Sequence, residues 1–224
     1  MPGLFSQAIE LEVLKNRFGF SAGGIVLNPS YNIAPRQEVP IVVREDRSIL
    51  KMMRWGLVPF WAKEESIGDN MINARAETVT QRLSFKNSFK ERRCLVLVDG
   101  FYEWKDDEKK GSKTPYRFVL KSREPFAFAG LWDIWKKPGG NTLLSFTIIT
   151  TEVNDLIHTI HNRMPVILSE KDEDIWLDQD MKDVNRLLPL LVPYPSDHMQ
   201  AYEVSTLVNS PKNDSPECIE PKDD

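Results

Sequence analysis

The stretch IHTIHNRMPVIL, residues 157–168, places two histidines and an arginine inside sequence that is otherwise typical of a buried strand. Two other stretches have the same character, INARAET at 72–78 and DGFYEWK at 99–105. A polar group in an apolar setting costs roughly 1–3 kcal/mol unless it has a partner or a function. Three such interruptions in one chain predict that the three stretches share one site.

Side-chain directions indicate which groups meet at this site. Alternation along a strand puts Glu103 on the same side as Phe101. The residues before the proline of HNRMP should be extended, which places His161 and Arg163 on one side. We expect these groups and the Asn73 amide to converge as a general acid/base pair, an anion holder and an orienter. A buried Glu103–Arg163 ion pair beside a core histidine is the alternative, and spacing alone leaves both open.

The succession of elements predicts the fold class. Many strands follow one another with few helices between them, which favours an α+β single domain with a mainly antiparallel, barrel-like β core and peripheral helices. Residues 39–45 and 48–55 form an expected hairpin. Apolar spacing predicts helices at 7–18, at 77–82, at 152–160 and in two pieces within 170–192. We expect one domain over 1–215 and a polar C-terminal tail over 216–224.

Composition limits the classes of function. A hydrophobic content of 41% and a charged content of 28% are ordinary for a soluble globular protein. No apolar run approaches the roughly 20 residues of a membrane span, and no signal pattern opens the chain. We therefore expect an intracellular, cytoplasmic protein without membrane contact, and a monomer.

Metal and disulfide chemistry are not expected. The two cysteines, Cys94 in an apolar strand and Cys218 in an acidic, proline-containing segment, are interpreted as plain thiols. His158 and His161 with Glu103 could supply two imidazoles and a carboxylate to zinc, but the spacing is weak support for such a site. We predict no metal and no cofactor.

The charge distribution is uneven. The formal net charge is −4, which by itself argues mildly against nucleic acid as a partner. Only two acidic residues interrupt a basic segment at 75–93, whose members are Arg75, Arg82, Lys86, Lys90, Arg92 and Arg93. Such a segment fits either a short nucleic-acid strand held by a few phosphates or a solvated basic loop.

Seven motifs together carry a family resemblance. They are YNIAP (31–35), RWGLVPFW (54–61), MINARAET (71–78), RRCLVLVDGFYEWK (92–105), FAFAGLW (126–132), IHNRMPVIL (160–168) and VSTLVNSPKND (204–214). In this order they resemble the SRAP (SOS response-associated peptidase) family, which senses abasic sites in DNA. The resemblance runs from about residue 5 to about residue 220. It implies a partner, single-stranded DNA containing abasic sites, and a role in the DNA damage response.

The resemblance also implies roles for single residues. Asn73 would orient the sugar or the N-terminus, Glu103 would move protons during imine formation, and His161 would assist opening of the sugar ring. Arg75 and Arg163 would hold the flanking phosphates. The residue types suit these tasks independently, since a histidine titrates near neutral pH and a glutamate can transfer protons.

Three further residues are candidates for DNA contact. Asn32 and Pro35 match family positions near the DNA, although read alone they are only turn residues. Trp61 follows Gly and Pro in a turn-rich segment. An exposed tryptophan there could stack on an unpaired base, and a buried one could close the end of a barrel, so both interpretations stay open.

The start of the chain departs from the family pattern. Family members begin Met-Cys-Gly-Arg, and the cysteine, freed by removal of the initiator methionine, closes a thiazolidine ring on the abasic aldehyde. This chain begins Met1, Pro2, Gly3, Leu4, so the thiol and the basic residue are absent. Pro2 occupies the position of the family nucleophile and would have only a secondary amine to offer.

Several functions remain open for this variant. The first is a non-covalent reader of abasic single strands. The second is a lyase in which a Pro2 iminium promotes strand cleavage by β-elimination, and the third is an engineered or artefactual substitution in a protein that naturally crosslinks. A peptidase that removes its own Met1 and a purely structural interaction domain are hypotheses of other classes.

Overall fold

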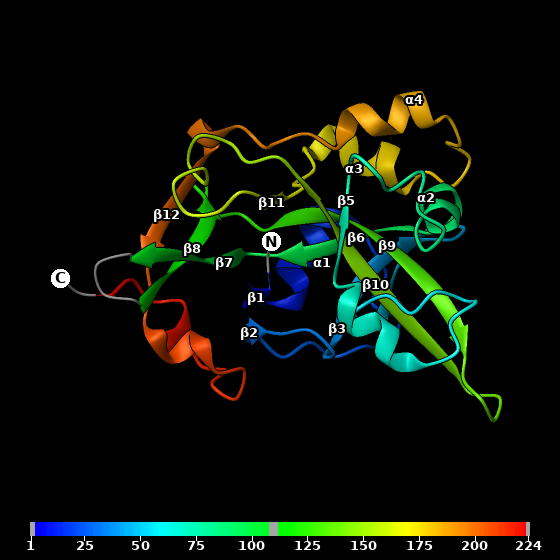
Figure 1. The fold of residues 1–224 in the computed structure, drawn as a ribbon, viewed down its shortest axis with the longest axis horizontal. Helices are drawn as coiled ribbons and strands as arrows, with labels where there is room; N and C mark the ends of the chain where they lie inside the picture. The colour runs from blue at the N-terminus through cyan, green and yellow to red at the C-terminus, as the bar shows by residue number, and fades with distance from the viewer. Residues whose placement is uncertain (1–2, 108–111, 223–224) are drawn as a thin grey trace.

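The computed structural model describes residues 3–107 and 112–222 (Figure 1). The strands are β1 Leu4–Gln7, β2 Ser30–Ile33, β3 Glu38–Arg44, β4 Ser48–Trp55, β5 Asn73–Arg75, β6 Arg93–Val98, β7 Gly100–Asp107, β8 Ser112–Leu120, β9 Phe126–Lys136, β10 Thr142–Thr151, β11 Met164–Pro165 and β12 Met199–Glu203. The α-helices are α1 Leu11–Phe18, α2 Lys86–Glu91, α3 Glu170–Leu177 and α4 Val184–Leu187. The 3₁₀ turns are η1 Glu65–Asn70, η2 Leu188–Leu190, η3 Ser196–His198, η4 Thr206–Asn209 and η5 Pro216–Cys218.

A closed barrel forms the centre of the molecule. Its strands pair in the order β10, β4, β3, β6, β9 and back to β10, and only the β10–β4 contact in this ring is parallel. The short strands β5 and β11 add to β10 outside the ring. The expected β3–β4 hairpin is confirmed, as is the mainly antiparallel α+β class with a barrel-like core.

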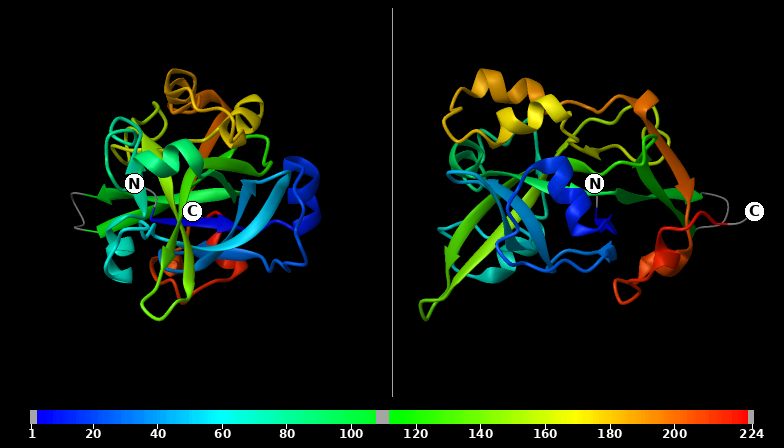
Figure 2. Two further views of the ribbon diagram at one scale, coloured as in Figure 1. Left: turned by 90° about the vertical axis from the view of Figure 1, so that its right-hand side faces the viewer. Right: turned by 180° about the vertical axis from the view of Figure 1, so that it is seen from behind.

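A second sheet packs beside the barrel, with strand order β12, β8, β7, β1, β2. Figure 2 shows the fold from the side and from behind. Aromatic rings pack between the two sheets. The ring centroids of Phe5 in β1 and Trp55 in β4 are 4.9 Å apart, and those of Phe101 in β7 and Phe128 in β9 are 5.7 Å apart. Because Phe101 faces the barrel, Glu103 two residues on faces the same way.

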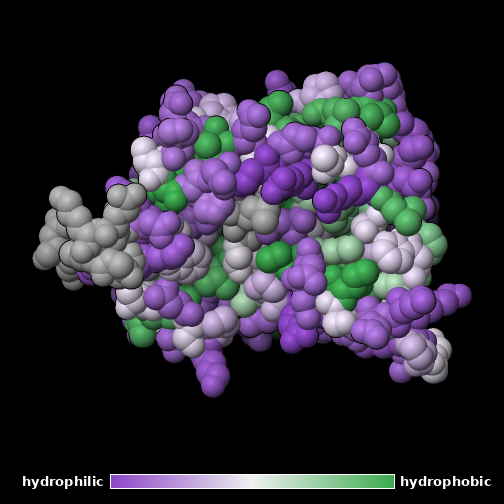
Figure 3. All heavy atoms as spheres, in the orientation of Figure 1, coloured by the Kyte–Doolittle hydropathy of each residue, from purple (hydrophilic) through white to green (hydrophobic). Residues whose placement is uncertain are grey.

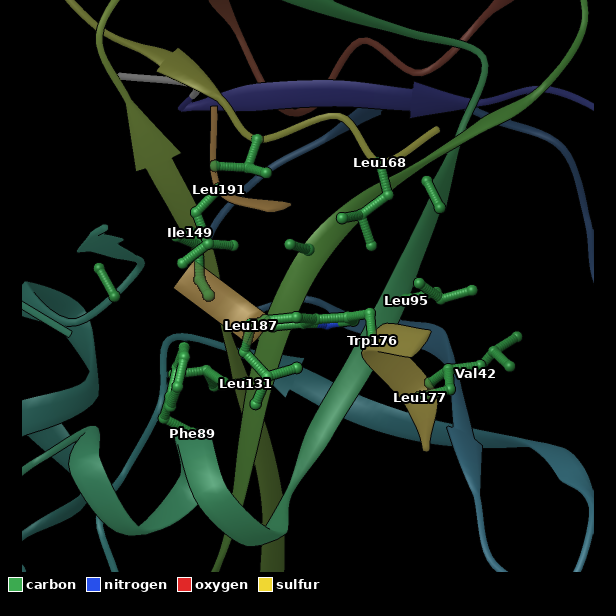
Figure 4. Close-up of a cluster of buried hydrophobic side chains, with 14 of the residues drawn as sticks. Val42, Phe89, Leu95, Leu131, Ile149, Leu168, Trp176, Leu177, Leu187 and Leu191 are labelled. Atoms are coloured by element: carbon green, nitrogen blue, oxygen red, sulfur yellow. The ribbon is translucent and has the colours of Figure 1, made fainter. Parts of the chain in front are cut away.

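The barrel wall is buried on both faces, which explains why residues 94–98 of β6 read as one continuous apolar run. Cys94, Val96 and Val98 point into the barrel. Leu95 and Leu97 point outward, to the helices. Figure 4 shows Trp176 of α3 and Phe89 of α2 packed on this outer face. The interior is tightly filled, because a Cβ at Gly130 would lie 2.8 Å from the Cys94 sulfur. Cys94 is a buried core thiol, and burial raises its pKa.

Three helix expectations needed correction. The helix predicted at 7–18 begins only at Leu11, because residues 4–7 form a strand, although Gly19 ends it as expected with φ 62°. In place of the helices predicted at 77–82 and 152–160, residues 77–81 and 155–160 form successive hydrogen-bonded turns. Runs this short do not repay helix nucleation unless packing supports them. The two helical pieces predicted within 170–192 are present as α3 and α4.

The segment predicted as a polar tail packs on the domain as far as residue 222. Cys218 is buried in η5, and the Tyr202 hydroxyl donates to the Ile219 carbonyl at 2.9 Å. The backbone N–H of Lys222 donates to Glu203 at 2.9 Å. Residues 216–222 are therefore part of the folded body.

Candidate functional site

The C-terminal end of β10 brings two of the three polar stretches together. Thr150 pairs with Arg75 of β5 on one side and with Pro165 of β11 on the other. The β5 pairing is parallel and the β11 pairing is antiparallel. Residues near 73–75 and 161–165 meet here although they are far apart in the sequence.

The third stretch reaches the same place from the second sheet. Glu103 on β7 is 3% exposed, and its Oε2 lies 3.9 Å from Nε2 of His161. The predicted convergence of this carboxylate and this imidazole is present. The alternative, a Glu103–Arg163 ion pair, is not what the structure shows, because Arg163 pairs with Glu77 instead.

A backbone contact sets the tautomer of His161. The N–H of Arg163 donates to His161 Nδ1 at 3.0 Å, so Nδ1 accepts and the proton of the neutral ring lies on Nε2, facing Glu103. Burial lowers the pKa of His161 from its ordinary value. The ring is therefore neutral at neutral pH and offers an N–H donor at this site.

Burial has the opposite effect on Glu103. Removal of the carboxylate from water raises the pKa of Glu103 to about 7. Near neutral pH this group exists in both protonated and ionised forms. A carboxyl group poised in this way, beside a neutral imidazole donor, is suited to taking and returning a proton.

Arg163, which the resemblance predicts to hold a phosphate, is engaged in an ion pair. Its guanidinium donates to both Glu77 carboxylate oxygens at 2.5 and 2.9 Å, and to the Thr150 carbonyl at 2.6 Å. The side chain is only 15% exposed, and Glu77 compensates its charge. This geometry does not fit a phosphate holder. It ties the segment that carries His161 to β10 and to the turn after β5.

Arg75 and Asn73 lie on β5 at the same end of the barrel. Arg75 is exposed, so a guanidinium is presented to solvent next to the His161 segment. Asn73 is half-buried and pairs with Ile148 of β10. Figure 3 shows that the face of the molecule carrying β7 and β11 is largely hydrophilic, with small hydrophobic patches between.

The other residues predicted to contact DNA differ in how exposed they are. Trp61 is 39% exposed in the connection between β4 and β5, whereas Trp55 is fully buried, so the open question about Trp61 is decided for the surface. Pro35 is half-buried. Asn32 is fully buried and donates from Nδ2 to three carbonyl oxygens of the segment after β12, those of Val208, Ser210 and Asn213. Its expected contact with DNA does not fit this enclosed position.

A hollow of about 780 Å³ opens beside His161. Its lining includes Asp106 of β7, Glu152 at the end of β10 and residues 158–162. Glu77, Asp106 and Glu152 were not among the site residues predicted from the sequence. Only Glu77 carried a signal, since it lies in the same INARAET stretch as Arg75.

Residues at the start of the chain are directed toward Glu103. β1 pairs with β7 so that Leu4 lies opposite Tyr102 and Phe5 opposite Phe101. Extending this antiparallel register by one step from the Leu4–Tyr102 pair places the backbone of Gly3 opposite Glu103. Pro2, the position of the expected nucleophile, lies outside the described residues.

The described residues contain neither a metal-binding cluster nor a membrane-spanning helix. Within 3–107 and 112–222, no group of three or more His, Cys, Asp or Glu side chains could hold a metal ion. In the same part of the chain, none of the helices has the length and apolar character needed to cross a membrane.

Comparison with known proteins identifies the family of this chain. The sequence profile described as SOS response associated peptidase (SRAP) matches residues 1–211. The chain belongs to the SRAP family. The crystal structure of a protein from Bacteroides thetaiotaomicron superposes on this chain with a TM-score of 0.87 at 26% identity, and the match covers 98% of this chain and 99% of that protein.

Curated relatives of this SRAP chain carry informative names. The abasic site processing protein YoqW of Bacillus subtilis is 50% identical over 194 residues, which is 86% of each chain. The abasic site processing protein YoaM of the same organism is 47% identical and covers 86% of this chain and 85% of its own. The abasic site processing protein HMCES of Gallus gallus is 35% identical over 86% of this chain and 66% of its own.

Burial of Glu103 predicts a stability effect with a definite sign. Because folding raises the pKa of Glu103 from 4.5 to about 7, ionisation opposes folding, and stability is lost as pH rises from 4.5 to 7. Glu103→Gln removes this loss. The measurement is urea unfolding at pH 4 to 8. As pH rises, we expect the free energy of unfolding of the Gln variant to increase relative to that of the wild type, by at most about 3 kcal/mol.

Glu77→Gln is the control, and its stability relative to the wild type should change with pH in the opposite direction. Hydrogen bonds from Arg163 lower the pKa of Glu77, so Glu77→Gln should lose stability near neutral pH and approach the wild type as pH falls below 4.5. Glu77 is 46% exposed, so solvent screening keeps this effect small. A stability difference for Glu103→Gln that does not change with pH would contradict the assignment.

Proposed function

We propose that this protein binds abasic sites in single-stranded DNA and that its Glu103–His161 pair acts on the abasic sugar. The observation that carries the proposal is the buried carboxylate 3.9 Å from an imidazole Nε2, at the edge of an open hollow. The family and the names of its relatives point to abasic sites. We infer a reader as the first function, because residue 2 is proline and not the cysteine of the family pattern.

The pair suits the chemistry of a ring-closed abasic sugar. Opening this hemiacetal requires loss of the proton on the C1 hydroxyl, cleavage of the bond from C1 to the ring oxygen, and protonation of that oxygen. Ionised Glu103 can take the first proton and return it to the ring oxygen, while the Nε2–H of His161 donates a hydrogen bond that stabilises the oxygen on which negative charge develops. The product is an open-chain aldehyde, with no net change in protons.

Single-stranded DNA suits the surface better than duplex DNA. The exposed indole of Trp61 offers a stacking platform for an unpaired base, worth roughly 1–3 kcal/mol. An abasic sugar inside a duplex would first have to be turned out of the helix. Arg75 supplies an exposed positive charge at the site, although the whole chain carries a formal net charge of −4. Only a few phosphate contacts are then expected.

Charge reversal at Arg75 tests the binding site. We expect Arg75→Glu to weaken binding to a single-stranded oligonucleotide with one abasic site by roughly tenfold or more and to reduce the salt slope by about 0.7, one phosphate contact on a single strand. Arg47→Glu is the matched control. Arg47 is also exposed, but it lies in the β3–β4 turn before the N-terminal end of β4, and the chain leaves the other end of β4 toward β5. Fluorescence anisotropy at several salt concentrations measures both. Equal affinities for the two variants would contradict the site.

A trapping experiment separates the reader from the lyase. Intact mass first establishes whether Met1 is removed, and the protein is then incubated with abasic oligonucleotide with and without borohydride. A reader gives no adduct on a denaturing gel while it keeps binding on a native gel. An adduct that requires borohydride, together with strand scission, would overturn the reader in favour of a Pro2 iminium lyase.

A gain of function provides the positive control. In Pro2→Cys protein without Met1, the α-amine and thiol can condense with the aldehyde and release water, leaving a thiazolidine that survives denaturation. We expect this adduct without borohydride, and slower formation when Glu103→Gln is added. A stable adduct that forms equally fast with Glu103→Gln would remove Glu103 from the proposed chemistry.

A further inference from the structure

The first strand of the second sheet is unusual in its buried polar residues. All four residues of β1 are buried, and two of them are Ser6, at 0% exposure, and Gln7, at 4%. Gln7 donates from Nε2 to the Leu97 carbonyl at 2.9 Å. Buried polar side chains on a strand specify its register, because they are satisfied only in one alignment.

Ser6 is held by a residue two strands away. Its hydroxyl donates to the Gly100 carbonyl at 3.3 Å and accepts from Nη2 of Arg117 at 3.0 Å. Arg117 lies on β8 and is 4% exposed. The same Nη2 lies 3.1 Å from the Asp99 carboxylate, so the buried guanidinium has its counter-charge at the start of β7.

Arg117 links four neighbouring strands. Its Nη1 donates to the Tyr202 hydroxyl of β12 at 2.7 Å, and its Nη2 reaches Ser6 of β1 across β7. The guanidinium lies against the backbone of Gly100, where a Cβ would come within 2.7–2.8 Å of Nε, Cζ and Nη2. Glycine at this position therefore makes room for the link between β8 and β1.

We propose that Arg117, acting through Ser6, is a positioning residue for Glu103, because it holds β1 in the register that brings Gly3 beside that carboxylate. Ser6 pairs with Gly100, Phe5 with Phe101 and Leu4 with Tyr102, and the next step reaches Glu103. A slip of one residue would turn Phe5 out of its aromatic contacts with Trp55 and Phe128. β1 then covers Glu103 only while the polar link is intact.

This inference deepens the proposed function, since it concerns the same site, but its test requires no DNA. Among the described residues, the titratable groups facing Glu103 are His161, at 3.9 Å, and Tyr116, its pairing partner on β8. Ser6→Ala alters neither of them. A change in the Glu103 pKa in this variant then reports a change in the position of β1, and not a change in the charge of His161 or Tyr116.

The experiment is a ¹³C NMR titration of the Glu103 carboxyl in Ser6→Ala and Ser145→Ala. Both serines are 0% exposed, and Ser145 accepts from the Val58 N–H at 2.8 Å in the barrel, so each variant loses buried hydrogen bonding. We expect the Glu103 pKa to fall from about 7 toward 4.5 in Ser6→Ala and to stay in place in Ser145→Ala. An unchanged value in Ser6→Ala, or an equal fall in both variants, would overturn the proposal.

Gly100→Ala provides a second route to the same result. The new methyl group displaces the Arg117 guanidinium and leaves Ser6 in place, so the Glu103 pKa should fall again. Faster hydrogen exchange of the Phe5 amide in both Ser6→Ala and Gly100→Ala should accompany the shift. A lowered pKa without faster exchange would contradict the role of β1. Failure of the wild type to bind abasic DNA would contradict the proposed function without altering this titration.

Discussion

The pairing at the end of β10 is the constraint on which the site depends. Thr150 has β5 on one side and β11 on the other, and the guanidinium of Arg163 donates to the Thr150 carbonyl at 2.6 Å. This three-strand arrangement places the exposed Arg75 next to the segment that carries His161. Without it, two of the three polar stretches would have no reason to meet.

The second sheet contributes the costly element, a glutamate in an enclosed position. β7 turns Phe101 toward the barrel, and alternation then obliges Glu103 to point the same way. The cost of this burial appears as a pKa near 7 and is the property that makes the carboxyl useful near neutral pH. Stability and chemistry are therefore coupled at one residue.

The sequence predicted the local features well. Alternation in DGFYEWK predicted the side of Glu103, the 39–55 segment predicted its hairpin, and the residues before Pro165 predicted that His161 reaches the site. The partner of Arg163 could not be predicted, because Glu77 reaches it only through the pairing of β5 and β11 on β10. The same holds for Asn32, whose three carbonyl acceptors come from residues more than 170 positions away. Motif membership marked these residues without separating those that line a surface from those that hold the fold.

Chemical-shift mapping tests most directly whether the region of β5, β11 and Glu103 is where the protein binds the abasic site of the DNA. Isotope-labelled protein would be titrated with two single-stranded oligonucleotides that differ only in one abasic position. We predict that the abasic strand shifts the His161 and Asn73 resonances strongly and that the intact strand shifts mainly Arg75 and Trp61. Equal shifts with both strands, or the largest shifts in the β3–β4 turn around Arg47, would contradict the assignment.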